Sequence, residues 1–134
     1  MAKKLFDESL TLTKAEEQIM QLLWKKKRAF VNDLMEMMPN PKPAYNTVST
    51  VLRILEQKGF VGHKKFGKIH QYFPLVSQTE YVSNSLNRLN SAYFQNSYAR
   101  LVNFFVEEDK LTSREIKEIS ELLDSLKRKK MIND

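Results

Sequence analysis

Cysteine is absent from the 134-residue sequence, and glycine and proline are scarce, with three and four residues respectively. Without cysteine the chain has no disulfide bonds, no thiolate ligands for metals and no thiol-based switch. No glycine-rich loop of the kind that cradles phosphates is present either. These absences exclude disulfide frameworks, cysteine metal sites and phosphate-loop chemistry.

Long hydrophobic runs are also missing. No apolar stretch approaches the roughly 20 residues that a helix needs to span a bilayer. Residues 1–14 lack the apolar segment of a secretory signal. We therefore expect a cytoplasmic protein that is not itself a membrane protein.

Histidine is rare, and groups suited to catalysis are few. The two histidines, His63 and His70, fall in a predicted hairpin, where we expect exposed polar side chains. No Ser-His-acid set and no cluster of metal ligands accompanies them. The sequence therefore predicts neither an enzyme nor a protein that binds a metal or cofactor.

Positive charge is present in excess, and only in the first half of the chain. Residues 1–76 carry 13 Lys and Arg against 7 Asp and Glu, whereas residues 77–134 carry 9 of each, so the net charge of +6 belongs to the first half. This distribution is expected if the first half alone contacts a polyanion. The alternative is that the charge only aids solubility.

Hydrophobic periodicity predicts two short helices at the start of the chain. The first spans about 14–26 and opens with a capping box, Thr13-Lys14-Ala15-Glu16, followed by apolar Ala15, Ile19, Leu22 and Leu23. The second spans about 31–38 and stops at the proline-rich segment 39–43, because proline lacks an amide donor.

A third helix and a hairpin follow. The helix spans about 43–58, with Pro43 at its first position and Gly59 as its left-handed terminator. Two β-prone runs within 60–74 flank the turn 66–68 and predict a hairpin with a basic tip. Three helices followed by a hairpin form a winged helix-turn-helix, in which the helix 43–58 is the recognition helix.

The predicted recognition helix has two unlike faces. A helical wheel places the core stripe at Val48, Val51, Leu52 and Leu55. The opposite face is polar and free of acids: Asn46, Ser49, Thr50, Arg53 and Gln57. Asn, Gln and Arg read base edges in the major groove through paired hydrogen bonds, and Ser and Thr adapt to either partner. The alternative is a polar surface helix without a ligand.

Phosphate contacts are expected beside this face. Residues at the start of the helix can donate to phosphate, and lysines of the hairpin can follow the backbone or the minor groove. A solvated charged hairpin is the alternative for the lysines. The predicted DNA-binding residues are Lys42, Tyr45, Asn46, Thr47, Ser49, Thr50, Arg53, Lys64, Lys65 and Lys68.

From about residue 78 the sequence predicts a long helix over some 28 residues, a break at 107–110 and a final helix opened by a second capping box, Thr112-Ser113-Arg114-Glu115. This much apolar surface cannot be buried within 57 residues, so we expect a symmetric homodimer. The predicted dimerisation residues are Val82, Leu86, Leu89, Tyr93, Leu101, Val102, Phe105, Ile116, Ile119, Leu123 and Leu126.

The predicted fold class is mostly α with a small β-hairpin wing: a winged helix-turn-helix domain at 1–76 and a C-terminal helical dimerisation domain at 77–134.

Several segments resemble the penicillinase-repressor family of bacteria, of the BlaI/MecI type with copper-responsive relatives. They cover about residues 10–127 and include Leu12-Thr13-Lys14-Ala15-Glu16 through Leu23-Trp24, Ala44-Tyr45-Asn46-Thr47-Val48, Leu55-Glu56-Gln57-Lys58-Gly59-Phe60, Gln71-Tyr72-Phe73-Pro74-Leu75-Val76 and Leu111-Thr112-Ser113-Arg114-Glu115-Ile116. The resemblance implies a homodimeric repressor that binds palindromic double-stranded operator DNA and blocks transcription. The copper branch uses C-terminal cysteines, so copper sensing through that motif is excluded.

In the antibiotic-responsive branch, the resemblance implies induction by a membrane-bound sensor metalloprotease that cuts an Asn-Phe bond in the dimerisation domain. The candidate cleavage region here is Asn103-Phe104-Phe105. Alignment on Leu111 places the cut at Phe104-Phe105, one residue beyond the Asn-Phe bond. The same residues are also explained as apolar positions of the dimer core.

A second class of function stays open at this point. The winged helix could serve as a protein-interaction module without sequence-specific DNA binding, with its charge acting only on solubility. Salt-dependent retention on heparin or DNA distinguishes the two classes.

Overall fold

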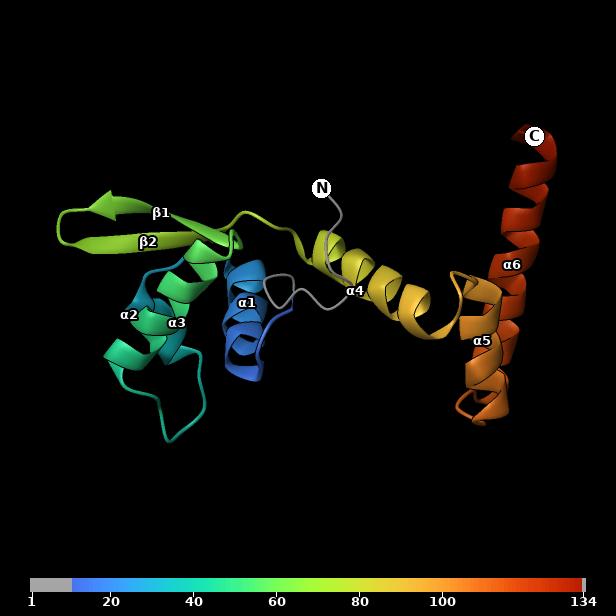
Figure 1. The fold of residues 1–134 in the computed structure, drawn as a ribbon, viewed down its shortest axis with the longest axis horizontal. Helices are drawn as coiled ribbons and strands as arrows, with labels where there is room; N and C mark the ends of the chain where they lie inside the picture. The colour runs from blue at the N-terminus through green and yellow to red at the C-terminus, as the bar shows by residue number, and fades with distance from the viewer. Residues whose placement is uncertain (1–10, 134) are drawn as a thin grey trace. The chain divides into compact units, whose positions relative to one another are not determined.

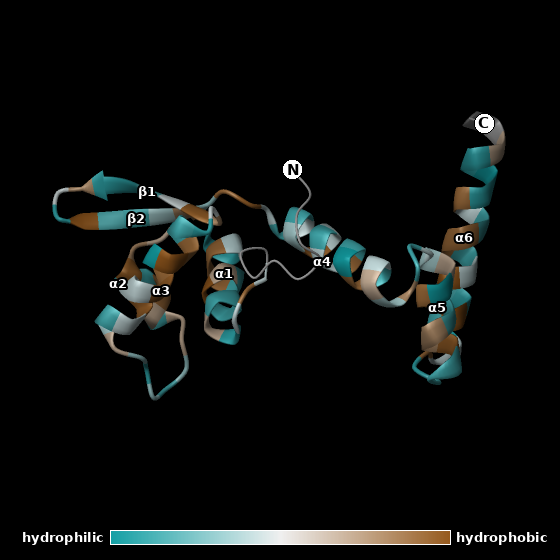
Figure 2. Ribbon diagram, in the orientation of Figure 1, coloured by the Kyte–Doolittle hydropathy of each residue, from teal (hydrophilic) through white to brown (hydrophobic). Residues whose placement is uncertain are grey.

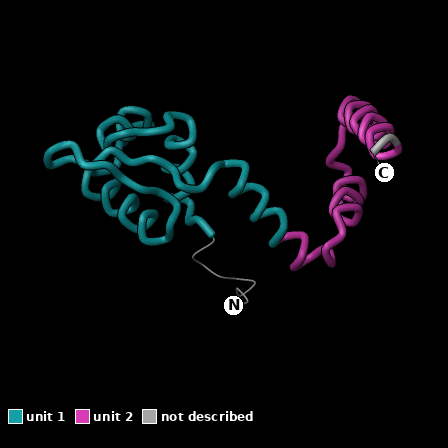
Figure 3. Tube along the Cα trace, turned by 90° about the horizontal axis from the view of Figure 1, so that it is seen from above, with its two compact units in different colours: residues 1–88 teal, residues 89–134 magenta. Residues whose placement is uncertain are grey.

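A computed structural model describes residues 11–133 of the chain, with side chains for residues 11–131. Two compact units divide the chain, residues 1–88 and residues 89–134 (Figure 3). The first ten residues of the predicted 1–76 domain lie outside the described residues. The elements are α1 (Lys14–Lys26), α2 (Val31–Glu36), α3 (Tyr45–Gln57), β1 (Val61–Phe66), β2 (Ile69–Pro74), α4 (Gln78–Tyr93), α5 (Tyr98–Glu107) and α6 (Ser113–Asn133) (Figure 1).

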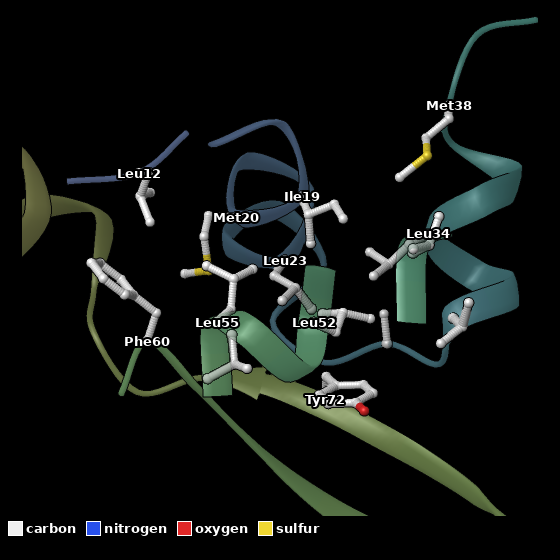
Figure 4. Packing of buried hydrophobic residues seen from close by; sticks show 14 residues of the cluster. Leu12, Ile19, Met20, Leu23, Leu34, Met38, Leu52, Leu55, Phe60 and Tyr72 are labelled. Atoms are coloured by element: carbon white, nitrogen blue, oxygen red, sulfur yellow. The ribbon is translucent and has the colours of Figure 1, made fainter. Parts of the chain in front are cut away.

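The predicted fold class is confirmed. The chain is mostly helical, and its hairpin of β1 and β2 follows three short helices, as in a winged helix-turn-helix (Figure 1). The core of the first unit lies between these helices and the hairpin. Leu23 of α1 and Leu52 and Leu55 of α3 are fully buried and meet near its centre (Figure 4).

The capping box of α1 forms as predicted. The Thr13 hydroxyl accepts from the Glu16 amide at 3.2 Å, and the Glu16 carboxylate accepts from the Thr13 amide at 2.8 Å. The apolar stripe is confirmed at Ile19 and Leu23, which are buried, but not at Ala15, which is exposed while its neighbour Glu16 is buried. Burial of this carboxylate is compensated by the Lys58 ammonium, which donates to it at 2.8 Å.

The start of α3 differs from the prediction, and its end agrees. Pro43 is not the first helical residue: Ala44 is the extended N-cap, and its carbonyl accepts from the amides of Thr47 and Val48. Gly59 follows the helix with φ +85°, the left-handed conformation that glycine adopts with least strain.

The hairpin is antiparallel, with Val61 opposite Pro74 and Phe66 opposite Ile69. Gly67 turns the chain at φ +65°. The inner strand, β2, also pairs with the segment before α2, since the amides and carbonyls of Ala29 and Tyr72 exchange hydrogen bonds of 2.9 and 2.8 Å. This bridge attaches the hairpin to the helical core.

Residues 78–105 were predicted as one long helix, and this prediction is wrong. The helix is interrupted after Tyr93, where Gln95 and Asn96 adopt φ values of +55° and +60°. The Asn90 carbonyl accepts from the amides of both Phe94 and Asn96, which ends α4, and the Ser97 hydroxyl caps α5. The apolar spacing continues through the break, so periodicity alone did not reveal it.

The start of α6 agrees with the prediction. Thr112 and Glu115 form the second capping box, with bonds of 3.0 Å and 3.1 Å between side chains and amides. No helix of the described part of the chain is both long and apolar enough to cross a membrane.

The first compact unit extends beyond residue 76 into α4. The Tyr81 ring lies 5.8 Å from the Trp24 ring and 5.9 Å from the Phe60 ring. The Trp24 indole donates to the Val76 carbonyl at 2.8 Å, and Arg88 donates to the Thr11 hydroxyl at 2.6 Å. The beginning of α4 is therefore packed on the winged-helix core.

Candidate nucleic-acid interface

The polar face of α3 is solvent-accessible. Val48, Leu52 and Leu55 are buried on the opposite side, as the wheel predicts, and Val51 packs partly against them. Among the predicted base-reading residues, Ser49 is half-buried, and Asn46, Thr50 and Arg53 are exposed. The fold therefore leaves an acid-free strip of hydrogen-bonding groups on the outer side of α3.

Part of this strip is ordered by contacts within the helix. The Thr50 hydroxyl donates to the Asn46 carbonyl at 2.8 Å, and an Arg53 guanidinium nitrogen lies 3.5 Å from the same hydroxyl. Thr50 thus uses its proton within α3 and keeps oxygen lone pairs for a donor. Arg53 carries the positive charge of the strip.

A groove of about 310 Å³ lies between α3 and the hairpin. Its lining combines hydroxyl, phenol, guanidinium, ammonium and imidazole groups with the apolar side chains of α2 and β2. Eight residues line it: Val31, Tyr45, Ser49, Arg53, Lys68, Ile69, His70 and Tyr72. Four predicted DNA-binding residues are therefore brought together here: Tyr45, Ser49, Arg53 and Lys68.

The first turn of α3 offers backbone donors, because its N-cap, Ala44, has no side-chain hydrogen bond to the helix. Exposed amides at a helix N-terminus favour anions such as phosphate. Thr47 is exposed here, and Tyr45 is 43% exposed.

Lys42 is placed differently from the other predicted contacts. Its ammonium donates to the carbonyls of Met35, Glu36 and Met38 at 2.7, 3.3 and 3.0 Å. These carbonyls belong to the C-terminal end of α2, where a cation is favoured by the helix dipole. Lys42 lies in the turn before α3, as the sequence predicts. Its ammonium, however, is hydrogen-bonded to the end of α2 in this structure and is not a free cation.

The hairpin presents its lysines near the tip, and Lys64, Lys65 and Lys68 are all exposed. Lys64 lies over the Phe66 ring at 5.4 Å from the centroid. The Phe66 ring also packs edge-on against Phe30 at 5.6 Å, which supports the tip from the helical core. The tip is therefore a basic projection with an apolar base.

A cluster at the hairpin was not found from the sequence. His63 Nδ1 lies 2.9 Å and 2.7 Å from the two carboxylate oxygens of Glu56, and the His63 ring stacks on His70 with centroids 4.0 Å apart. The expectation that both histidines are simply exposed is wrong, because each is half-buried. The diagonal placement of His63 and His70 across the hairpin follows from the strand register, and the contact with Glu56 follows from the packing of α3 on β1, so neither could be found from sequence spacing.

Burial raises the pKa of Tyr72, which lies beneath these imidazoles, and the negative charge of Glu56 raises it further. Its hydroxyl is therefore a neutral phenol at the pH of ordinary binding experiments. Tyr72 is only 3% exposed and belongs to the core, although it also contributes to the groove wall.

The predicted dimerisation residues are a second candidate set, drawn from both compact units, and none of them is buried. Two are half-buried, Leu101 and Ile119, and the others are exposed: Val82, Leu86, Leu89, Tyr93, Val102, Phe105, Ile116, Leu123 and Leu126. The sequence did not single out Val106, Leu122 and Met131, which are 59, 69 and 80% exposed. Exposed apolar residues therefore lie on both α5 and α6, where hydrophobic and hydrophilic segments are mixed along the ribbon (Figure 2).

An apolar groove of about 490 Å³ opens within the second unit, lined by Leu89, Tyr93, Phe94, Leu101, Phe104 and Phe105. Phe104 lies 5.6 Å from Phe94 and 6.3 Å from Phe105 between ring centroids. The candidate cleavage residues Asn103, Phe104 and Phe105 thus lie inside the helix α5, and the Asn103 amide donates to Glu107 at 3.0 Å.

The described part of the chain contains no group of three or more His, Cys, Asp or Glu side chains that could hold a metal ion. The groups assembled at α3 and the hairpin are hydrogen-bond donors, acceptors and cations without a nucleophile–base pair. Their chemistry suits recognition of a polyanion that presents base edges.

Comparison with known proteins gives a family match over most of the chain. The model of the family described as penicillinase repressor matches residues 12–125. The methicillin resistance regulatory protein MecI of Staphylococcus aureus (strain N315) is 32% identical over 120 residues, which cover 88% of this chain and 97% of MecI. The penicillinase repressor of Bacillus licheniformis is 25% identical over 120 residues, covering 89% of this chain and 94% of that protein.

Among solved structures, the complex structure of hsRosR-S1 is 16% identical and covers 78% of this chain and 96% of that chain, with a TM-score of 0.51. This likeness concerns the fold alone.

Proposed function

This chain belongs to the penicillinase repressor family, and from that membership we propose that it is a homodimeric transcriptional repressor that places α3 in the major groove of a palindromic operator. The observation that carries the proposal is the acid-free polar strip on the exposed side of α3, beside the basic hairpin. Arg and Asn are suited to bidentate contacts with guanine and adenine. Of the relatives named above, one is described as a regulatory protein and the other as a repressor, which supports repression as the activity.

In this proposal, Asn46, Ser49, Thr50 and Arg53 face base edges, and the residues around them position the helix. Tyr45, Thr47 and the first amides of α3 face one phosphate backbone. Lys64, Lys65 and Lys68 contact the backbone beside the hairpin. Lys42 contributes from the turn before α3, mainly by fixing the end of α2.

The surface of the second unit supports the proposed homodimer. Neither α5 nor α6 contains a buried residue among those whose side chains are described, although both carry many large apolar side chains. Exposed apolar patches of this extent mark an interaction site, and a second copy is the symmetric solution. Two copies of α3 then read two half-sites about one helical turn, or a multiple of it, apart.

We also propose that cleavage near Asn103-Phe104-Phe105 by a membrane-bound sensor metalloprotease inactivates the repressor. A protease needs an extended segment, so α5 must unwind locally before its bonds can be cut. α5 is short, and isolated helices below about 12 residues are marginal in water. Cleavage would divide the proposed dimer surface and weaken operator binding through loss of the dimer.

The test is selection of duplexes from a random-sequence library by the full chain, followed by footprinting and sedimentation. We expect a palindromic consensus, protection on one face of the DNA and a dimer both free and bound. Enrichment of no sequence would contradict the proposal. In that case, complete loss of DNA retention at low salt would favour the interaction-module alternative.

A further inference from the structure

Ile69 is an exposed aliphatic residue in a groove whose other accessible side chains carry polar groups. The groove between α3 and the hairpin has a volume of about 310 Å³, and α3 lines it with the phenol of Tyr45, the hydroxyl of Ser49 and the guanidinium of Arg53. Ile69 lies on the hairpin side and is 49% exposed, whereas the other aliphatic residue of the lining, Val31, is buried in the core. An accessible hydrocarbon surface therefore stands beside hydrogen-bond donors and cations.

The fold accounts for only part of the exposure of Ile69. In the hairpin register Ile69 lies opposite Phe66, so the two form the last cross-strand pair before the turn. Phe66 has a further contact, since its ring packs against Phe30 at 5.6 Å between centroids. Ile69 is not part of the buried core and keeps about half of its surface accessible. A threonine would suit the strand as well as isoleucine does, because both are β-branched, and it would expose less hydrocarbon.

Cations flank this hydrocarbon surface. Lys68 precedes Ile69 at the turn and is exposed, and Arg53 lines the same groove from α3. Among the described residues, no carboxylate lines the groove, and neither of these two cations forms an ion pair. The groove therefore suits a chain in which anionic groups alternate with apolar ones.

A deoxyribose-phosphate strand has this alternation. Each phosphate is anionic, and the sugar between two phosphates presents carbon-bound hydrogens, including those of its 2′-methylene. RNA carries a 2′-hydroxyl at the same position, and this group is the one by which a protein distinguishes RNA from DNA at a given site. The cations of the groove match the phosphates, and the hydrocarbon side chain of Ile69 matches the sugar.

We propose that Ile69 is a specificity-determining residue that packs against the 2′-methylene of one deoxyribose, in the strand lying between α3 and the hairpin, and thereby selects deoxyribose over ribose at that nucleotide. The inference rests on the proposed function, in which α3 enters the major groove beside the hairpin. Binding removes the side chain of Ile69 from water, which contributes affinity. A ribose at the same place leaves a hydroxyl against hydrocarbon, which weakens binding.

The experiment measures binding of the full chain to its best duplex from a random-sequence selection. Single ribonucleotides replace the deoxyribonucleotides of one half-site in turn, on each strand, and fluorescence anisotropy gives the dissociation constant of every duplex. For wild type, we expect a loss of affinity of about threefold to tenfold at one or two positions, comparable with the loss of one or two methylene contacts. The other positions should change little.

Ile69→Thr distinguishes a contact with the sugar from a role in the hairpin. It keeps a β-branched residue in the strand and replaces hydrocarbon with a hydroxyl. Affinity for the all-DNA duplex should fall about threefold to tenfold, and the ribonucleotide penalty should largely disappear. A ribonucleotide also alters the local shape of the duplex, but both proteins meet this effect, so it cancels in the double-mutant comparison. A merely structural role predicts an unchanged ribonucleotide penalty.

Two control variants accompany Ile69→Thr. Lys68→Gln removes the neighbouring cation, so it should weaken binding to all duplexes and retain the ribonucleotide penalty. Leu75→Thr changes another exposed apolar residue, which follows β2 and does not line the groove, and it should behave as wild type. Circular dichroism identifies any variant that does not fold. The wild-type ribonucleotide scan tests the proposal by itself if Ile69→Thr is among them.

A flat wild-type scan on a well-bound duplex would overturn the inference and leave the repressor proposal intact. A penalty that persists unchanged in folded Ile69→Thr would do the same. Uracil in place of each thymine provides a further comparison: a loss that disappears in Ile69→Thr would assign Ile69 to a thymine methyl group instead of a sugar. If selection enriches no duplex, the proposed function fails first and the inference fails with it.

Discussion

Glu16 illustrates how one buried charge is retained in a small core. Burial raises the pKa of this carboxyl, but the hydrogen bond from Lys58 and the bond from the Thr13 amide outweigh that effect, and the pKa lies below its usual value of 4.5. The same side chain caps α1 and ties it to the end of α3. The sequence identifies Glu16 only as the acid of a capping box, but in the structure Glu16 also joins α1 to the end of α3.

The sign of its pH effect follows from the lowered pKa. Stability from ionised Glu16 is fully present above about pH 4.5, the value for the unfolded chain, and is lost as pH falls through the lower folded value. Glu16→Gln should reduce the free energy of unfolding at pH 6 by about 1.5–3 kcal/mol, and the deficit should shrink toward pH 3. Urea unfolding at both pH values measures this. Glu17→Gln, at an exposed neighbour, should show no such deficit.

At Arg53, the contribution of base contacts to DNA affinity can be distinguished from the contribution of its positive charge. Arg53→Ala should weaken binding to the selected duplex by about 1–3 kcal/mol if Arg53 makes a bidentate contact with guanine, with a smaller loss on random DNA. Lys64→Ala should weaken both duplexes similarly, since a phosphate contact carries no sequence information. Fluorescence anisotropy at one salt concentration gives both comparisons. Equal loss on both duplexes for Arg53→Ala would remove it from the base-reading set.

At the level of elements, the packing of α4 bears on where the winged-helix domain ends. The sequence predicts a boundary after residue 76, because apolar periodicity changes there. Yet Tyr81 packs on Trp24 and Phe60 and accepts from the Leu12 amide at 3.4 Å. An aromatic side chain so placed contributes packing that a chain ending at residue 76 lacks.

We therefore expect a fragment of residues 1–88 to be more stable than a fragment of residues 1–76, by about 1.5–3 kcal/mol for burial of one large side chain. Tyr81→Ala in the longer fragment should remove most of the difference, whereas Val82→Ala, at an exposed position, should not. Denaturant unfolding of the four proteins provides the test. Equal stability of the two fragments would support the boundary at residue 76.

On the scale of the whole molecule, the two compact units differ in how they bury apolar surface. The first unit has a continuous core across three helices and the hairpin. The second unit leaves Leu122, Leu123 and Leu126 of α6 at least half exposed. We expect a unit of residues 89–134 to need a partner, because a segment this small that leaves large apolar side chains in water buries little surface by itself.

Leu123→Asp should raise the dimer dissociation constant by roughly tenfold or more, because it would bury an unpaired carboxylate in the proposed interface. Lys117→Gln changes the net charge by the same amount on an exposed position of α6 and should leave dimerisation unchanged. Sedimentation equilibrium over a range of concentrations measures both. A Leu123→Asp protein that dimerises as wild type would place the interface elsewhere.

Local chemistry was sufficient to predict the helix starts at Thr13 and Thr112, the terminator at Gly59, the hairpin turn and the core stripe of α3. Each depends on residues within about one turn of one another, so sequence spacing contains the needed information. Helical spacing also predicted that Asn46, Ser49, Thr50 and Arg53 share one polar face of α3. The ligand of that face has to be identified by experiment.

The tertiary structure decided what depends on residues distant in the chain. The ion pair of Glu16 with Lys58, the docking of Tyr81 on Trp24 and the contact of Glu56 with His63 all require the packing of separate elements. Lys42 could be read from the sequence only as a free cation, whereas the fold brings it to the carbonyls that end α2. The break between α4 and α5 is local by contrast: the Asn90 carbonyl accepts from the nearby Asn96 amide, and apolar periodicity missed it because it does not encode backbone hydrogen bonds at a helix end.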